Sequence, residues 1–160
     1  MCGGLITITP GEGHDRESEQ VVAGNTCLYG ATGGKLFIRG AAGERFCVRN
    51  SGATAVVEGV GEHGCEYMTG GVAVILGETG RNFGAGMTGG VAYVYDAAAQ
   101  FERRCNRDLI ALSRLDSEAD EAQLRTLLEE HAAHTGSLRA KALLADWPVA
   151  RAAFWKVAPR

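Results

Sequence analysis

The sequence predicts an all-β core, a single-stranded parallel β-helix with about 18–19 residues per coil, followed by short α-helices. Three observations predict it. Glycines that open apolar runs recur every 18 or 19 residues, aliphatic residues keep a fixed offset from them, and the chain has 23 glycines but 3 prolines. A repeat of this length is too short for two packed helices, but it is long enough for one coil of short strands joined by glycine turns.

The repeat covers residues 1–96, which we expect to form the coils. Its first glycines are Gly33, Gly52, Gly70 and Gly89, so the steps are 19, 18 and 19 residues. Stacked coils place like residues over like, about 4.8 Å apart, so aliphatic columns are expected to fill the interior. Two such columns follow the glycines: Leu36, Ala55, Ala73 and Ala92, and then Ile38, Val57, Ile75 and Val94. A third apolar set lies between these columns in the sequence: Phe37, Val56, Val74 and Tyr93.

Residues 97–160 depart from the repeat and are expected to form an irregular segment and short helices that pack on the β-helix, giving one domain overall. Ser117, or the aspartate before it, can cap a helix that Gly136 would end. Ser137 can cap a second helix, and Pro148 is expected to end it. The apolar positions of this part are Leu124, Leu127, Leu128 and His131, then Ala140, Leu143, Leu144 and Trp147, and finally Phe154, Trp155 and Val157.

Charge, hydropathy and cysteine usage exclude several classes of function. The formal net charge is −3, which does not favour a nucleic-acid or anionic-membrane partner. No apolar run approaches the roughly 18 residues needed to cross a bilayer, and the first residues lack the pattern of a signal peptide. The five cysteines include no Cys-x-x-Cys pair, so we expect reduced thiols in a cytoplasmic protein, not a disulfide framework or a zinc site.

One column of the repeat contains cysteines. Cys47 and Cys65 hold the position that Gly84 occupies in the next coil, so the two thiols are expected on adjacent coils in the same orientation. Such a pair could bind a metal or oxidise to a disulfide. Because free cysteine is often buried as a small apolar residue, we interpret the column as a ladder inside the coils.

Two segments resemble nucleophile sites. The start Met1-Cys2-Gly3 is similar to that of amidotransferases whose N-terminal cysteine is catalytic. The same residues also match the glycine turn and apolar run that begin each repeat. The rest of an amidotransferase domain is absent. The segment 62–66, Glu-His-Gly-Cys-Glu, places a thiol beside an imidazole, but we interpret it as a surface turn whose Cys65 points inward.

Two further patterns suggest ligands. His131 and His134 are three residues apart on a predicted helix, but a metal site needs a third ligand and none is evident. The glycine-rich stretch 30–34 has no Gly-Lys-Ser/Thr ending and precedes a strand, not a helix, so a phosphate loop is not predicted. We therefore predict no catalytic, cofactor-binding or metal-binding residue on this chain.

Several runs carry a family resemblance that covers nearly the whole chain. They are residues 28–34, 43–53, 57–71, 80–83 and 86–90, together with His134-Thr135-Gly136-Ser137 and the end of the chain. These runs resemble the C-terminal domain, with its GXGXG motif, of the glutamate synthase large subunit. The resemblance implies a right-handed β-helix followed by short helices, and a structural role in glutamate biosynthesis and ammonia assimilation.

The resemblance also implies where the chemistry of the family lies. In that oxidoreductase, the domain supports the glutaminase domain and the FMN-binding synthase domain, which are the expected partners. No FMN, iron–sulfur or glutaminase residue of the family maps onto this chain, so those cofactors are expected on domains absent here, and the chain alone is not expected to be catalytic.

The start of the chain leaves two arrangements open. Because it begins inside a coil, we expect an N-terminally truncated form of the family's domain, whether a gene fragment, a split-gene subunit or an excised piece. The alternative is a freestanding module that assembles with separate glutaminase and synthase subunits. In either case the first coil is expected to expose a strand edge, which favours self-association.

Overall fold

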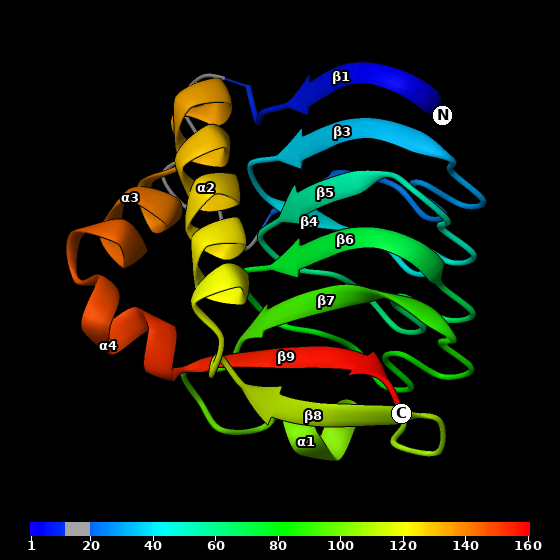
Figure 1. Cartoon of the computed structure of the whole chain (residues 1–160). Helices are drawn as coiled ribbons and strands as arrows, with labels where there is room; N and C mark the ends of the chain where they lie inside the picture. Colours follow the sequence, from blue (N-terminus) through cyan, green and yellow to red (C-terminus); the bar gives the residue numbers. More distant parts are fainter. Residues whose placement is uncertain (12–19) are drawn as a thin grey trace.

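The chain forms a stack of parallel coils with a layer of helices on one side (Figure 1). The structure is a computed structural model that describes residues 1–11 and 20–160. Five parallel strands lie one above another in the coils: β1 (Cys2–Ile8), β3 (Gly33–Ile38), β5 (Thr54–Val57), β6 (Thr69–Ile75) and β7 (Gly89–Tyr95). The predicted parallel β-helix is confirmed, with about four turns. The polar segment 11–19, which its sequence suggests is a loop crossing between coils, falls almost entirely outside the described residues.

The register between coils follows the sequence repeat. Ala55 pairs with Ala73 and Val57 with Ile75, and the same columns continue through β3 and β7. These two columns are buried inside the coils. The intervening set that starts at Phe37 is also in register, but it packs against the helices. The difference follows from strand geometry, because successive side chains point to opposite faces of the sheet.

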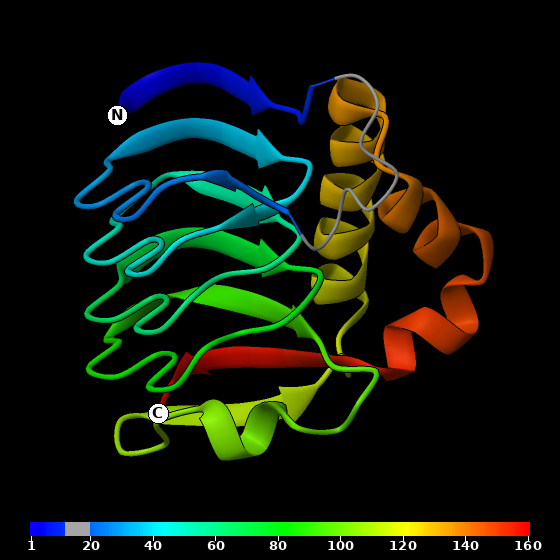
Figure 2. The same ribbon diagram turned by 180° about the vertical axis from the view of Figure 1, so that it is seen from behind.

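A second, shorter side of the coil contains β2 (Val21–Ala23) and β4 (Ala41–Ala42), which pair in parallel. Beyond these strands the coils stay connected by single hydrogen bonds, such as the one from the backbone N–H of Val60 to the carbonyl of Glu78 (2.9 Å). Figure 2 shows this side of the stack, where the turns of successive coils lie over one another.

The third side of each coil has an unusual backbone. Alternate residues there have positive φ, although L-amino acids with a side chain disfavour this region by about 1–2 kcal/mol. Hydrogen bonds to the coils on both sides hold the segment; for example, Cys47 N–H donates to Cys27 and Arg45 N–H to Glu62, both at 2.9 Å. In coil order the residues are Thr26, Leu28 and Gly30; Arg45, Cys47 and Arg49; His63, Cys65 and Tyr67; and Asn82, Gly84 and Gly86.

The C-terminal third adds two strands to the sheet, which the sequence did not predict. After the short α1 (Phe101–Arg104), β8 (Ile110–Arg114) lies at the lower edge of the stack in Figure 1. The apolar tail is β9 (Phe154–Pro159), which pairs antiparallel with both β7 and β8. Ile110, Phe101 and Val157 point into the coil core and close this end of it.

The helical layer consists of α2 (Glu118–Thr135), α3 (Leu138–Ala145) and α4 (Trp147–Ala152). Ser117 caps α2 by accepting a hydrogen bond from Asp120 N–H, and Gly136 ends it with a left-handed φ of 69°, so both predictions are confirmed. The predicted cap of α3 at Ser137 is confirmed as well. The prediction for Pro148 was wrong: α3 ends before it, and Pro148 lies in the first turn of α4, where a missing N–H costs nothing.

The helices cover the outer face of the long strands. Figure 1 shows α2 running along the stack, across the strands, with α3 and α4 outside it. Its buried residues Leu124 and Leu128 pack on Phe37, Val56 and neighbouring side chains. None of the described helices is long and apolar enough to cross a membrane.

The N-terminal end of the stack lacks a comparable cover among the described residues. Strand β1 pairs with β3 on one side only. Ile6 is in register with Leu36, yet its exposed fraction is 47% against 4% for Leu36. Leu5 is similarly exposed, at 49%. The first coil therefore presents a strand edge, as the sequence predicted, and it also exposes apolar side chains.

Candidate functional site

The cysteine column lies inside the coils, as its spacing predicted. Cys47 and Cys65 occupy the same left-handed position in adjacent coils, with φ of 58° and 56°, and both are fully buried. Burial, reinforced by the neighbouring Cys65 thiol, raises the pKa of Cys47 well above its usual value. A protonated thiol is a poor nucleophile and a poor metal ligand, so the column favours packing over chemistry.

Two further cysteines lie near the ends of the column but outside it, because Leu28 and Gly84 hold its left-handed position in the coils before Cys47 and after Cys65. Cys27 and Cys105 are partly buried and pack against the same core. Burial raises the pKa of Cys105 to about 12, against an opposing effect of Arg107. Across residues 1–11 and 20–160, no group of three or more His, Cys, Asp and Glu side chains is placed to hold a metal ion.

The segment 62–66 does not bring a thiol and an imidazole together. Cys65 faces the coil core, whereas His63 lies at the surface and its Nδ1 is 2.6 Å from Glu66 Oε1. The imidazole is thus paired with a carboxylate and not with the thiol that a Cys–His nucleophile requires.

The other candidate residues occupy ordinary structural positions. Cys2 is an exposed residue of β1 opposite Gly33. The glycine-rich stretch 30–34 leads into strand β3, so the helix that a phosphate loop needs does not follow it. His134 stacks on Phe37, with ring centroids 5.2 Å apart, and does not share a ligand with His131.

A buried polar cluster joins the coils to the helices, and sequence reasoning missed it. Glu58, directly after β5, is 2% exposed, and its Oε1 accepts a hydrogen bond from Ser137 Oγ. The same oxygen is 3.4 Å from Nε2 of His131, a residue with no exposed surface. The only sequence signal was the run His134-Thr135-Gly136-Ser137, whose partner 79 positions away could not be identified from one sequence.

The cluster contains the residue types of a hydrolase triad but not its arrangement. In a triad the histidine lies between the serine and the carboxylate and takes the proton of the serine. Here the carboxylate of Glu58 lies between Ser137 and His131, and all three are buried away from any substrate. The arrangement can hold two elements together, but it cannot activate the serine.

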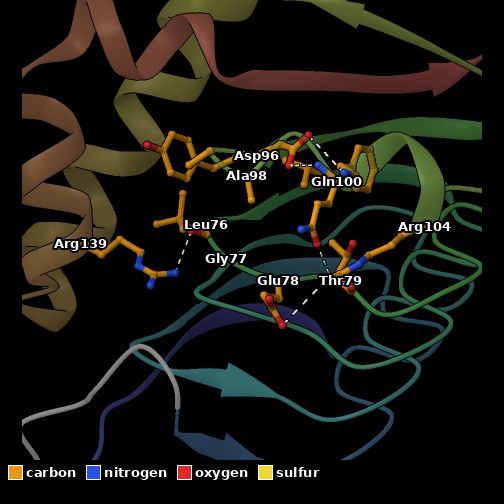
Figure 3. A pocket seen from close by; sticks show the side chains of 13 residues that line it. Leu76, Gly77, Glu78, Thr79, Asp96, Ala98, Gln100, Arg104 and Arg139 are labelled. Carbon is orange, nitrogen blue, oxygen red and sulfur yellow. Dashed lines mark hydrogen bonds and ion pairs between the residues drawn. The ribbon is translucent and has the colours of Figure 1, made fainter.

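A cavity of about 270 Å³ lies beside this cluster, at the carboxyl ends of β6 and β7 (Figure 3). Its apolar lining includes Leu76 and Phe101. Its polar groups are already engaged: Arg139 donates to the carbonyl of Leu76 (3.0 Å) and Arg104 to that of Thr79 (2.8 Å). Asp96, also in the lining, accepts from two backbone N–H groups and from the Trp155 indole. The cavity therefore presents few polar groups with spare bonding capacity.

Comparison with known proteins identifies the family. The model of the GXGXG motif family matches residues 1–160. The chain is 56% identical over 160 residues to a ferredoxin-dependent glutamate synthase of Pyropia yezoensis and 48% identical over 160 residues to the chloroplastic ferredoxin-dependent enzyme of Spinacia oleracea. It is 52% identical over 158 residues to the NADH glutamate synthase of Schizosaccharomyces pombe.

The matches cover nearly all of this chain but little of its relatives. Each spans 99% of the chain, but only 10%, 10% and 8%, respectively, of the three relatives. The chain belongs to the GXGXG motif family and corresponds to one domain of a glutamate synthase.

Proposed function

We propose that this chain is a structural domain of a glutamate synthase that supports the catalytic domains and supplies no catalytic residue. The observation that carries the proposal is the match of 99% of the chain to a tenth of each ferredoxin-dependent relative. The coil interior supports the proposed structural role, because apolar columns and buried thiols such as Cys47 fill it. It is therefore packed as a hydrophobic core and not as an active site. On this proposal, glutaminase chemistry, FMN and the iron–sulfur cluster belong to other parts of the enzyme.

The proposed partners are the glutaminase domain and the FMN-binding synthase domain, in the cytoplasm. The exposed apolar end at Leu5 and Ile6 is the surface best suited to an intramolecular or intermolecular contact. The same surface is compatible with the alternative, a freestanding subunit that assembles with separate glutaminase and synthase subunits. In that case the separately produced chains should co-purify as a stoichiometric complex.

The test is made on the purified 160-residue chain. After incubation with FMN and removal of the free flavin by dialysis, we expect the protein to show no flavin absorbance. We also expect it to release no ammonia from glutamine. A yellow protein with a stoichiometric flavin spectrum, or glutaminase turnover that Cys2→Ala abolishes, would overturn the structural role. Cys65→Ala serves as the control, since its thiol is buried and should not affect any such activity.

A further inference from the structure

A hollow at the end of the stack gathers arginines in an otherwise acidic chain. The formal net charge of the chain is −3, yet four of its 16 lysine and arginine residues line this one place. The hollow has a volume of about 330 Å³ and lies between the turn at residues 81–82 and the segment 103–108, at the end of the stack where Figure 1 shows α1 and β8. We name it the arginine hollow, after Arg81, Arg103, Arg104 and Arg107.

The backbone of the coil that contains β6 adds a donor to this hollow. In each earlier coil, the first left-handed residue of the third side donates its N–H to a carbonyl of the next coil: Thr26 to Glu44 (2.8 Å), Arg45 to Glu62 and His63 to Arg81 (both 2.9 Å). Asn82 holds this position in the coil of β6, with a similar φ of 59°. The segment that follows α1 pairs with Phe83 instead, whose N–H donates to the carbonyl of Arg104 (3.2 Å).

The N–H of Asn82 consequently has no acceptor among the described residues. By the pattern of the earlier coils, this N–H points towards the layer that would come next. The arginine hollow occupies that place, and Asn82 is part of its lining. An oxygen atom of a ligand in the hollow can therefore accept the hydrogen bond that a further coil would have accepted.

The arginines keep N–H donors that the described residues do not use. A guanidinium group carries five N–H donors in a planar fork. Arg104 uses one nitrogen for the carbonyl of Thr79 (2.8 Å) and another for Oε1 of Gln100 (3.2 Å). Arg103 is exposed and forms no ion pair with a described residue. Arg107, also exposed, has a carboxylate oxygen no closer than 3.6 Å, which is too far for a hydrogen bond.

The carboxylates near the hollow leave these donors available. Among the described residues that line it, Asp108 supplies the one carboxylate. Three further carboxylates lie near the arginines from outside the lining, at 2.8, 3.6 and 3.9 Å: Glu62 near Arg81, Glu102 near Arg107 and Glu78 near Arg104. The last two are 52% and 89% exposed. Such exposed pairs contribute little, so a ligand with several negative charges can compete with them.

We propose that the arginine hollow binds an oxyanion of the phosphate class. One oxygen accepts from the N–H of Asn82, and the others accept from Arg103 and Arg107. A phosphate group carries a charge of about −1.5 to −2 at pH 7 and several strong acceptor oxygens, and arginine forks match its geometry. The ligand is either the free ion or the phosphate group of a larger molecule, because both present the same oxygens. This site adds binding, and so goes beyond the proposed structural role.

Nuclear magnetic resonance of the 160-residue chain tests the site. Sodium phosphate is titrated at pH 7.5 against sodium chloride at matched ionic strength, and the amide and arginine side-chain signals are followed. We expect shifts that saturate as one site, that are largest at Asn82, Arg103 and Arg107, and that chloride does not reproduce. Shifts that do not saturate, that chloride reproduces, or that are absent from these residues would overturn the proposal.

Adenosine monophosphate distinguishes the two sources of the phosphate group. If it binds at least as tightly as inorganic phosphate, the hollow accepts the phosphate group of a larger molecule. If inorganic phosphate binds more tightly, the hollow selects the free ion. Both results keep the oxyanion site, whereas binding of neither compound would overturn it.

Variants assign the binding to this hollow. Arg103→Ala and Arg107→Ala should each weaken phosphate binding roughly tenfold, because each removes charge-assisted hydrogen bonds. Asp108→Asn should strengthen it roughly threefold, because it removes a carboxylate from the lining. Arg125→Ala removes an exposed arginine that pairs with Glu129 on α2, so it is the matched control and should bind as wild type. Equal weakening by Arg125→Ala would reduce the effect to overall charge and overturn the site. All four substituted side chains are exposed, so the variants are expected to fold.

Discussion

Gly89 lies directly against the carbonyl group of Thr69 in the preceding coil, so that a Cβ on Gly89 would overlap the Thr69 oxygen. Gly70 has the same relation to Ser51 one coil earlier. The glycine repeat is thus a packing requirement: at this corner the backbones of successive coils approach too closely for any side chain.

Gly89→Ala is expected to destabilise the chain by about 3 kcal/mol or more, because its methyl group meets rigid backbone and the coils must separate. Urea unfolding followed by circular dichroism measures this change. Gly24→Ala is the control, since no atom of the described residues lies within 4 Å of its Cβ position, and it should change stability by about 0.5 kcal/mol or less. Equal losses in the two variants would show that the close approach is not the cause.

Asp120 makes the interface of α2 with the last strands dependent on pH. Partial burial acts to raise its pKa, but hydrogen bonds from Lys156 (2.5 Å) and Tyr93 (2.9 Å) outweigh burial and lower it below the usual value of an aspartate. A lowered folded-state pKa means that the stabilisation is complete above the unfolded value and is lost as the pH falls through the folded value.

Asp120→Asn should therefore be less stable than wild type at pH 7, and the difference should shrink as the pH falls below about 4. Free energies of unfolding from urea titrations at pH 7, 5, 4 and 3 measure the difference. Asp116→Asn, an exposed aspartate just before the same helix, should show a small and constant difference. A difference for Asp120→Asn that grows in acid would contradict the assigned sign.

Much of the coil stack could be predicted from the sequence because neighbouring coils interact at a constant offset. The pairing of Val57 with Ile75 and the stacking of Cys47 with Cys65 both follow from a repeat of 18–19 residues. The helix caps at Ser117 and Gly136 could also be predicted, because capping depends on the local sequence. In the candidate site, only the inward orientation of the cysteines was predictable.

What could not be predicted depends on contacts without a period. Strand β9 pairs with β7 about 60 residues earlier, and Glu58 meets Ser137 across 79 positions. Nothing in a single sequence links these partners. The left-handed residues of the third side were missed for another reason: Arg45 and Tyr67 have side chains that ordinarily disfavour positive φ, so their backbone is set by the hydrogen bonds of the neighbouring coils.

The burial of the thiols predicts their reactivity. With a thiol reagent at pH 7.5, Cys2 should be modified first, whereas the fully buried Cys47 and Cys65 should react slower by on the order of a hundredfold. Peptide mapping of the modified chain identifies the sites. Cys2→Ser should remove the corresponding fast step, and fast modification of Cys47 in the native chain would show that the coil interior is accessible.

The open first coil predicts self-association. Ile6→Lys places a charge on the exposed edge strand and should reduce the mass observed by light scattering at high protein concentration, because edge charges oppose strand pairing. Val149→Lys, at an apolar residue of α4 that is also exposed (67% against 47% for Ile6), is the control and should leave the mass unchanged. A wild-type chain that stays monomeric at all concentrations would contradict the expectation.

The most direct test of the account is the proximity of methyl groups in one column. In a methyl-labelled chain, nuclear Overhauser effects should connect Val57 with Ile75 and Ile75 with Val94, because parallel coils place these residues side by side in the core. The account predicts both connections. Their absence, with contacts that instead match antiparallel pairing of β5, β6 and β7, would contradict it.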